Sequence, residues 1–252
     1  MTLAMSGHVA LVTGGAGGLG RSISTALADA GATVLVGYRT SAEAAHALAA
    51  QLPGVAGQPH RAVECDVSDS DGLRELASRV AAEFGGLDVL VNCAGMTRYV
   101  AHRALDELDD ELIDQIFTTN VRGAIASVRA FQSLLAQHGR GLVVNISSIA
   151  AQTAMGSNIA YCASKAAVDN LTKSLARALS PEIRVVSVSP GLVDTEFVRG
   201  LDEAWRAEQT ARTPLQRLAM PDEVATAVVV LATQLTFTTG AVIPIDGGRP
   251  LG

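Results

Sequence analysis

Short apolar runs alternate with longer segments in which apolar residues recur at helical spacing, and this alternation predicts parallel βα units. The expected strands are the short runs bounded by turn signals: His8–Thr13, Thr33–Gly37, Arg61–Cys65, Leu87–Val91, Gly141–Ile146, Arg184–Ser189 and Ala241–Ile245. The expected helices are the longer periodic segments: Gly18–Ala30, Ser41–Gln51, Ser68–Phe84, Leu108–Gln137, Asn158–Leu179 and Pro221–Thr233. The pattern therefore predicts an α/β fold without internal repeats or linkers.

Residues at the expected helix starts support these boundaries. Ser41, Ser68 and Asn158 are suitable N-caps, and Pro221 suits a first helical turn. Asp194–Met220 is the longest segment without clear periodicity. Long loops in compact domains tend to be functional, so this segment is a candidate for a functional loop.

Composition narrows the class of protein. A chain of 252 residues with 48% hydrophobic content can form one α/β domain that buries roughly 70–75% of its unfolded surface. A net charge of −6 provides no basic stripe for nucleic acid or an anionic membrane. No apolar stretch reaches the ~18 residues of a membrane span, and Met1–Gly7 lacks the regions of a signal peptide. The expected location is cytoplasmic.

The cysteines show no metal-binding spacing. Cys65, Cys93 and Cys162 cannot all pair with one another, and each is expected to be a small buried side chain. We therefore expect no metal site.

A glycine-rich turn joins the first expected strand to the first expected helix. Gly14, Gly18 and Gly20 in Thr13–Gly20 let the backbone turn tightly and approach a pyrophosphate. The helix that follows presents free N–H groups and a partial positive charge to such a group. The turn therefore predicts a dinucleotide site, although its Gly-x3-Gly-x-Gly spacing differs from the commonest Gly-x-Gly-x2-Gly.

Tyr161 and Lys165 are candidates for acid–base chemistry. Positions four apart share one helix face, so the phenol and the ammonium project side by side. A nearby cation favours a phenolate, which makes lysine a suitable partner for a tyrosine that transfers protons. Taken alone, the pair also fits a solvated helix face. Ser148, thirteen positions upstream, and the glycine turn favour the chemical interpretation.

Together these motifs resemble those of the short-chain dehydrogenase/reductase family, in the branch with Thr-Gly-x3-Gly-x-Gly and Tyr-x3-Lys. The resemblance covers nearly the whole chain and extends to further segments: Asn92–Gly95, Asn120, Asn145–Ser148, Pro190–Thr195 and Gly240–Gly248. Cys93 departs from the family's usual Asn-Asn-Ala-Gly, which we interpret as a packing variant.

The resemblance implies a single doubly wound (Rossmann) domain over residues 1–252, with helices on both faces of a seven-stranded parallel sheet ordered 3-2-1-4-5-6-7. It also implies a substrate lid at about 194–220 and hydride transfer between a nicotinamide and a carbonyl–alcohol pair. Tyr161 would donate the proton, Ser148 would hold the oxygen, Lys165 would assist Tyr161 and bind the ribose, and Asn120 would hold a water molecule.

The expected cofactor is NADP(H) rather than NAD(H). The strand Thr33–Gly37 ends without the acidic residue that binds a ribose 2′-hydroxyl, no acid follows before Glu43, and Arg39 could bind a 2′-phosphate instead. The alternative is that Arg39 is an ordinary exposed arginine, but the missing acid favours the phosphate-binding role. Asp66 could hold either the adenine or the turn into Ser68. The expected cofactor contacts, taken from the resemblance, are Gly14, Gly18, Leu19, Gly20, Arg39, Thr40, Ser41, Asp66, Val67, Asn92, Ala94, Gly95, Tyr161, Lys165, Pro190, Gly191, Val193 and Thr195.

The resemblance also suggests which residues face a substrate. Met96, Met155 and Val193 are expected at the substrate, while Phe197 and Trp205 either close over it or anchor their loop. The pattern is similar to 3-oxoacyl-thioester reductases. However, Ala136–Arg140 and Leu179–Ile183 are thinly basic, which favours a free ketone, alcohol or small acyl compound over a carrier protein.

Other functions and the assembly state complete the expectations. The alternatives are an NAD-dependent alcohol dehydrogenase, a non-redox enzyme such as an epimerase or dehydratase, and a silent nucleotide-binding protein. The full set Asn120, Ser148, Tyr161 and Lys165 favours an oxidoreductase.

The broad apolar surface of the helix after Tyr161 predicts an oligomer. By resemblance this is a homotetramer, with a dimer as the alternative.

Overall fold

The computed structural model describes residues 4–54, 58–200 and 202–251. Its centre is one parallel sheet ordered β3-β2-β1-β4-β5-β6-β7, which confirms the predicted doubly wound α/β fold. The strands are β1 (Val9–Val12), β2 (Thr33–Tyr38), β3 (Arg61–Glu64), β4 (Val89–Asn92), β5 (Gly141–Ile146), β6 (Ile183–Pro190) and β7 (Val242–Ile245).

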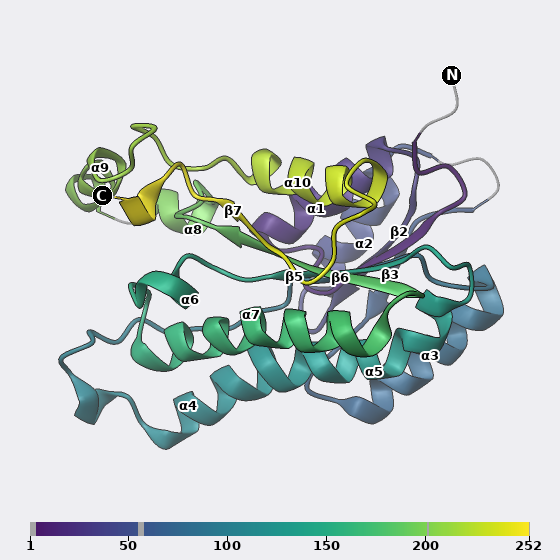
Figure 1. Cartoon of the computed structure of the whole chain (residues 1–252), viewed down its shortest axis with the longest axis horizontal. Coiled ribbons are helices and arrows are strands. Elements are labelled where there is room, and N and C mark those ends of the chain that lie inside the picture. The colour runs from purple at the N-terminus through teal and green to yellow at the C-terminus, as the bar shows by residue number, and fades with distance from the viewer. Residues whose placement is uncertain (1–3, 55–57, 201, 252) are drawn as a thin grey trace.

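Helices cover both faces of this sheet (Figure 1). One layer contains α1 (Gly18–Asp29), α2 (Ala42–Gln51) and α10 (Pro221–Thr233), and the other contains α3 (Ser70–Phe84), α5 (Gly123–Ala136) and α7 (Ile159–Leu179). The remaining helices are α4 (Asp110–Phe117), α6 (Ala150–Thr153), α8 (Glu196–Arg199) and α9 (Glu203–Ala211), with short 3₁₀ turns at Leu105–Glu107 and Arg249–Leu251. Within the described part of the chain, no helix is long and apolar enough to cross a membrane.

Strand residues alternate between two cores because successive side chains point to opposite faces of a sheet. Ala10 and Val12 pack under α1 and α10, whereas Val9 and Leu11 pack under α3 and α5. All four residues of β1 are buried, as expected for a parallel sheet that is covered on both faces. This burial explains why the strands read as continuous apolar runs in the sequence.

The single helix predicted over Leu108–Gln137 is wrong in one respect, because it is interrupted. A π-helical turn at Thr118–Arg122 separates α4 from α5. Asn120 lies in this turn, and its side chain bonds the backbone of Met96 in the loop after β4. A wider turn of this kind occurs frequently at functional sites, and here it turns a buried amide toward the adjacent loop.

Of the four predicted helix starts, two are confirmed, one is wrong, and one is correct in position but makes no capping bond. The Asn158 side chain accepts a hydrogen bond from Tyr161 N, and Pro221 occupies the first turn of α10. The third helix begins at Ser70 rather than Ser68, because the Asp69 carboxylate is the group that accepts from the first-turn amides. Ser41 lies at the N-cap position of α2, but its side chain makes no capping bond.

The segment 194–220, which showed no clear periodicity, contains the helices α8 and α9. Asp194 forms ion pairs with Arg199 at 3.1 Å and with Arg206 at 3.4 Å, so one carboxylate connects both helices to the end of β6. Arg249 in the C-terminal turn donates to the Gln209 side chain at 2.7 Å. Both helices are short, which explains why they left no clear periodic signal.

Asp88 is a buried carboxylate at the start of β4. It accepts from Val9 N at 2.8 Å, from Arg140 Nε at 2.7 Å and from His138 Nδ1 at 3.0 Å. Burial alone would raise the pKa of Asp88, but the hydrogen bonds from Arg140, Val9 and His138 outweigh it and hold the pKa below its usual value. The charged form therefore stabilises the fold.

We expect Asp88→Asn to lower the free energy of unfolding by about 3 kcal/mol near pH 7, because it removes the buried partner of Arg140. Since the folded pKa is depressed, this stabilisation is fully present above the ordinary value of ~3.9 and is lost as the pH falls through the folded pKa. Urea titrations at several pH values measure this difference, and Asp29→Asn, at an exposed position on α1, is the control. A difference that stays constant down to pH 3 would contradict the prediction.

Candidate active site

The glycine turn after β1 forms a backbone cradle at the start of α1. Gly14 has φ +64°, and a Cβ there would lie 3.1 Å from the Ala94 backbone. A Cβ on Gly20 would overlap the carbonyl oxygen of Gly14. No side chain caps α1, whose first turn contains no acidic residue, so the N–H groups at Gly18–Gly20 face outward without an anionic competitor.

A cleft of about 360 Å³ extends from this turn along the carboxyl ends of the strands. Such an edge is where open α/β sheets bind ligands. The predicted cofactor residues that line the cleft are Gly14, Gly18, Leu19, Gly20, Arg39, Thr40, Ser41, Asp66, Val67, Ala94 and Gly95. The volume, the free helix terminus and the glycines without room for a Cβ fit a dinucleotide.

Asp66 forms the turn into Ser68, one of the two roles expected for it. Its Oδ1 accepts from Ser68 N at 2.8 Å and from Ser68 Oγ at 2.6 Å, which forms the turn toward α3. The residue also lines the cleft. One carboxylate oxygen thus holds the turn, and the second remains for a ligand.

Thr13 connects the ends of β1 and β4, a role that the sequence did not reveal. Its hydroxyl accepts from Cys93 N and Ala94 N, both at 3.0 Å. These bonds hold the Asn92–Gly95 turn beside the glycine turn. A threonine before a glycine turn has no distinguishing sequence signal, because the backbone N–H groups that donate to it are about 80 residues away.

Lys165 and Tyr161 lie on one face of α7, as their spacing predicted. Lys165 is buried, and its Nζ donates to Ile146 O at 2.8 Å and lies 5.6 Å from the centroid of the Tyr161 ring. Anchoring by the last residue of β5 directs the ammonium toward the carboxyl end of the sheet. A lysine held in this way keeps further N–H donors for a ligand.

Ser148 follows β5 and lies at the start of the short helix α6, which the sequence analysis did not predict. Its Oγ accepts from Ala150 N at 3.2 Å, and its side chain is half-buried. Helix α6 packs against α7, the helix that carries Tyr161. A hydroxyl and a phenol thus occur on adjacent elements at the same sheet edge.

Asn120 is buried and makes three hydrogen bonds. Its Oδ1 accepts from Met96 N at 2.8 Å, and its Nδ2 donates to Met96 O and Ser164 Oγ, both at 3.1 Å. Beside it lies a cavity of about 10 Å³, lined also by Lys165 and Asn92. This volume is close to what one water molecule needs, and the polar lining suits one.

Asn92, expected at the cofactor, lies within the sheet rather than on the large cleft. Its Nδ2 donates to Asn145 Oδ1 at 2.9 Å, and Asn145 in turn donates to Thr172 Oγ1 on α7 at 2.9 Å. The Asn92 Oδ1 has no hydrogen-bond partner within the described part of the protein, and Asn92 lines the small cavity. Asn92 therefore joins β4, β5 and α7 behind the site.

The remaining predicted residues lie around the end of β6. Pro190 ends β6, Gly191 N bonds to Ile245 O, Val193 pairs with Ala219, and a Cβ on Gly18 would contact Thr195.

The other residues predicted to face a substrate lie on different elements. Met96 lines the cleft, while Met155 and Trp205 are partly exposed. Phe197 lies in α8, and its side chain falls outside the described part.

The three cysteines are free thiols. Burial raises the pKa of Cys65 to about 12 and that of Cys93 to about 11. Burial also raises the pKa of Cys162. Protonated thiols of this kind are poor nucleophiles.

The fold and the cleft define a dinucleotide-binding α/β protein with an anchored lysine–tyrosine pair. A sequence-family profile described as enoyl-(acyl carrier protein) reductase matches residues 14–249. The cis-4-hydroxycyclohexanecarboxylate dehydrogenase of Sinomonas cyclohexanicum is 40% identical over 250 residues, covering 97% of each chain. The D-threitol dehydrogenase of Mycolicibacterium smegmatis is 38% identical over 247 residues, covering 97% of this chain and 93% of its own.

Solved structures agree with the sequence comparisons. A crystal structure from Burkholderia xenovorans, assigned to the short-chain dehydrogenases/reductases, superposes with a TM-score of 0.89 at 35% identity and covers 97% of this chain and 98% of its own. The chain belongs to the short-chain dehydrogenase/reductase family, oxidoreductases that use a nicotinamide cofactor and act on CH–OH groups.

Proposed function

We propose that this protein catalyses reversible, NADP(H)-dependent hydride transfer between nicotinamide and a secondary alcohol or ketone. The observation that carries the proposal is the Tyr161–Lys165 pair, anchored by Ile146 O at the carboxyl edge of the sheet beside the dinucleotide cleft. The bound cofactor supplies or accepts the hydride. The protein's own residues then have to bind, orient and move a proton.

Tyr161 is assigned as the proton donor to the carbonyl oxygen in the reductive direction. Ser148 donates a hydrogen bond to the same oxygen, and this bond strengthens as negative charge develops. The positive charge of Lys165 stabilises the phenolate that forms when Tyr161 gives up its proton. The N–H donors of Lys165 that Ile146 O does not use are suited to ribose hydroxyls. Asn120 lines the 10 Å³ cavity, where a water molecule could connect Lys165 to a proton source.

The assignment of NADP(H) rests on the end of the cleft after β2. Arg39 lines the cleft with an exposed side chain, and Thr40 and Ser41 follow at the start of α2, where the Ser41 hydroxyl makes no capping bond. Among the cleft-lining residues the carboxylate is that of Asp66, whose Oδ1 accepts from Ser68. A guanidinium beside two hydroxyl side chains suits a 2′-phosphate, which a carboxylate in the same place would repel.

The proposed substrate is a free small molecule rather than a carrier-bound one. Arg140, the arginine of Ala136–Arg140, binds Asp88 and Gly7 O, and His138 also binds Asp88. These groups are therefore committed within the fold, which leaves little positive charge there for an acidic carrier protein. We propose that segment 194–220 closes over the substrate, with Trp205 on α9 contributing an apolar surface.

The reaction is tested by following the absorbance of reduced cofactor with three probe substrates. They are 4-hydroxycyclohexanecarboxylate and threitol, suggested by the names of the relatives, and a 3-oxoacyl-CoA thioester. We expect turnover with at least one free small molecule, and a higher kcat/KM with the NADP(H) form of the cofactor. No turnover with any probe would contradict the proposal. A 3-oxoacyl carrier protein is assayed as a fourth, comparison substrate, and turnover with that substrate only would contradict the assignment of a free small molecule.

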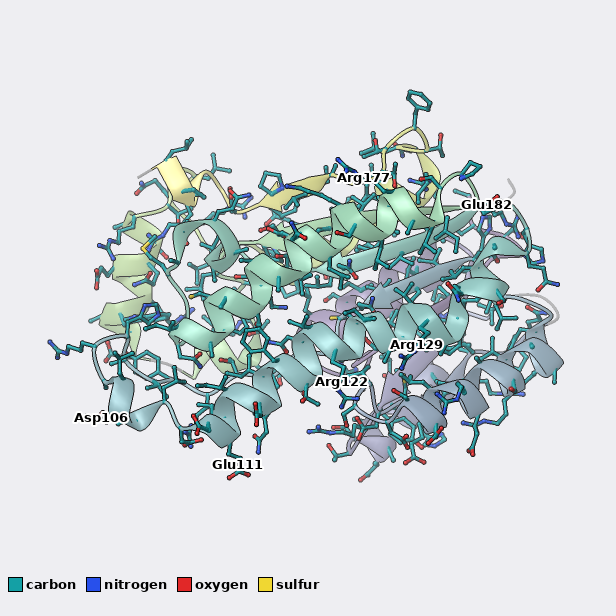
Figure 2. The ribbon with its side chains drawn as sticks, turned by 60° about the horizontal axis from the view of Figure 1, so that its bottom comes forward. Asp106, Glu111, Arg122, Arg129, Arg177 and Glu182 are labelled. Carbon is teal, nitrogen blue, oxygen red and sulfur yellow. The ribbon has the colours of Figure 1, made fainter. Side chains whose placement is uncertain are left out.

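We also propose that the protein is a homo-oligomer, with a homotetramer as the expected state. Figure 2 shows Asp106 and Glu111 at one end of the face formed by α4, α5 and α7, and Arg122 and Arg129 farther along it. Phe117 and Ile125 are exposed apolar residues on α4 and α5. A two-fold axis through this face would bring opposite charges together around an apolar centre.

Light scattering at micromolar concentration should give the mass of a tetramer, or of a dimer. Ile125→Glu should lower that mass, because it places a charge in an apolar contact. Ser78→Glu, at an exposed position on α3, is the control and should leave the mass unchanged. A wild-type monomer would refute the proposed assembly.

A further inference from the structure

Asn158 is buried at the N-cap position immediately before α7, three residues before Tyr161. Its Oδ1 accepts from Tyr161 N at 2.7 Å, so it caps the helix that carries the phenol. Its Nδ2 points the other way and donates to Arg98 O at 2.7 Å and Thr97 Oγ1 at 3.2 Å. One side chain thus joins the start of α7 to the loop after β4.

Other contacts support the same junction. Thr97 Oγ1 and Ser157 Oγ lie 2.5 Å apart, and Val100 N donates to Ser157 O at 2.8 Å. The His102 ring also lies 3.2 Å from Gly156 O. The loop after β4 is therefore bound to the residues that lead directly into α7.

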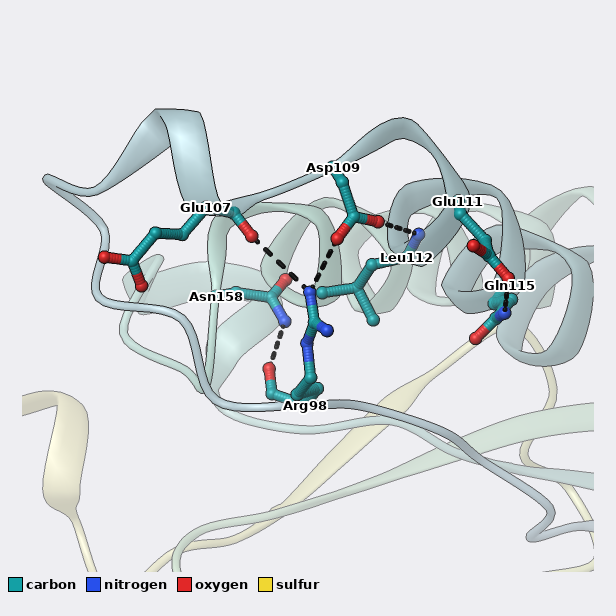
Figure 3. A network of polar contacts seen from close by, with 7 residues as sticks. All are labelled: Arg98, Glu107, Asp109, Glu111, Leu112, Gln115 and Asn158. Carbon is teal, nitrogen blue, oxygen red and sulfur yellow. Dashed lines mark hydrogen bonds and ion pairs between the residues drawn. The ribbon is translucent and has the colours of Figure 1, made fainter.

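The loop is also fixed on its opposite side, as Figure 3 shows. The Arg98 guanidinium bonds Asp109 Oδ2 at 2.9 Å and Glu107 O at 3.4 Å. Asp109 caps α4 by accepting from Leu112 N at 2.7 Å. The hydrogen bond from Leu112 N and then that from Arg98 hold the pKa of Asp109 below its usual range, although the ion pair with Arg98 is exposed to solvent.

The same loop segment begins at Met96, whose N and O are both bound by Asn120. Asn120 and Asn158 therefore hold the two ends of Met96–Arg98, one from the π-helical turn and one from the start of α7. This geometry links the position of the Tyr161 phenol to that of the cleft wall at Met96. Among common N-cap residues, only asparagine can both accept from the helix and donate two N–H bonds to the loop.

We infer that Asn158 is a positioning residue for Tyr161, an inference that rests on the proposed function. It fixes the first turn of α7, and with it Tyr161, relative to Met96–Arg98. The carbonyl oxygen of a substrate has to meet the Tyr161 phenol beside this segment. A role limited to helix capping requires only Oδ1. The positioning role requires the Nδ2 bonds as well, so the two roles can be separated by substitution.

The test compares Asn158→Ser and Asn158→Asp with Asn158→Ala. Aspartate retains a capping acceptor but has no donor for Arg98 O. Serine also retains a capping acceptor, but its shorter side chain has a single O–H in place of the two N–H donors, whereas alanine loses both functions. The matched control is Asn170→Ser, at an exposed position on the same helix. The measurements are kcat and KM with the best probe substrate, Kd for NADPH by calorimetry, and the melting temperature.

We expect serine and aspartate to restore most of the melting temperature lost in Asn158→Ala while kcat stays at least about tenfold below wild type. NADPH affinity should stay within about threefold, because apart from Met96 the residues that line the cofactor cleft lie outside the segment that Asn158 holds. If one variant fails to fold, the other decides the outcome. Restoration of kcat together with stability, or an equal loss of kcat in Asn170→Ser, would overturn the inference.

The proposed function fails separately from this inference. Near wild-type turnover in Tyr161→Phe would refute the role of the phenol and, with it, the positioning of that phenol. Loss of turnover in Tyr161→Phe with normal kcat in Asn158→Ser would refute only the role assigned to Asn158.

Discussion

Tyr161→Phe should lower kcat by about 10²- to 10⁴-fold, the usual contribution of a positioned general acid. Phenylalanine retains the ring that packs near Lys165 Nζ but removes the O–H that would reach the carbonyl oxygen. The backbone bond from residue 161 to Asn158 is unaffected, so α7 keeps its cap. Dissociation constants for NADPH should change little, since most of the cleft lies on other elements.

The matched control is Tyr99→Phe, which removes a hydroxyl from a largely exposed tyrosine. It should retain wild-type kcat with the same probe substrate. Steady-state assays and calorimetry on the three proteins give the comparison. Turnover within a few-fold of wild type in Tyr161→Phe would show that another group transfers the proton.

Arg39→Ala should reduce kcat/KM for NADPH by roughly tens- to hundreds-fold, in line with about 1.5–3 kcal/mol for a hydrogen bond to a charged group. The value for NADH should stay nearly unchanged, because a ribose without the phosphate does not need the guanidinium. Arg39 is exposed, so the variant should fold normally. The ratio of the two kcat/KM values measures the preference directly.

Arg79→Ala is the control for a loss of surface charge, since Arg79 is exposed on α3 away from the cleft-lining residues. It should leave the cofactor preference intact. A wild-type preference for NADH, or an unchanged ratio in Arg39→Ala, would contradict the proposed role of Arg39. If the wild type prefers NADH, the absence of an acid at the end of β2 is not sufficient to predict the cofactor.

The layered fold was predictable because a parallel sheet covered on both faces forces its strands to be short, apolar and separated by amphipathic helices. The seven strand segments and six helical segments were recognisable in this way, whereas the strand order came from the family resemblance. The pairing of Tyr161 with Lys165 was predictable because four residues make about one helical turn. Gly14 and Gly20 were informative, since Gly14 has a positive φ and a Cβ on Gly20 would overlap the Gly14 backbone.

Features that depend on distant contacts were not predictable. The π-helical turn at Thr118–Arg122 forms where Asn120 bonds to Met96, and nothing in the local sequence specifies that partner. The helices α8 and α9 are held by Asp194 and Arg249, which lie outside them. Asn92 was assigned to the cofactor by resemblance, but its partners are Asn145 and the small cavity.

The π-helical turn also allows two halves of one long helical segment to serve different cores. Leu112 and Ile116 before the turn pack with Val100 and Ala160, while Phe131 and Leu135 after it pack under the sheet. Each residue of an ideal helix advances by about 100°, so deleting one residue of the turn would rotate one half against the other. Such a rotation would turn the apolar side chains of one half away from their core, and packing in the other core could not compensate for it. Tolerance to insertion or deletion should therefore be lowest at Thr118–Arg122.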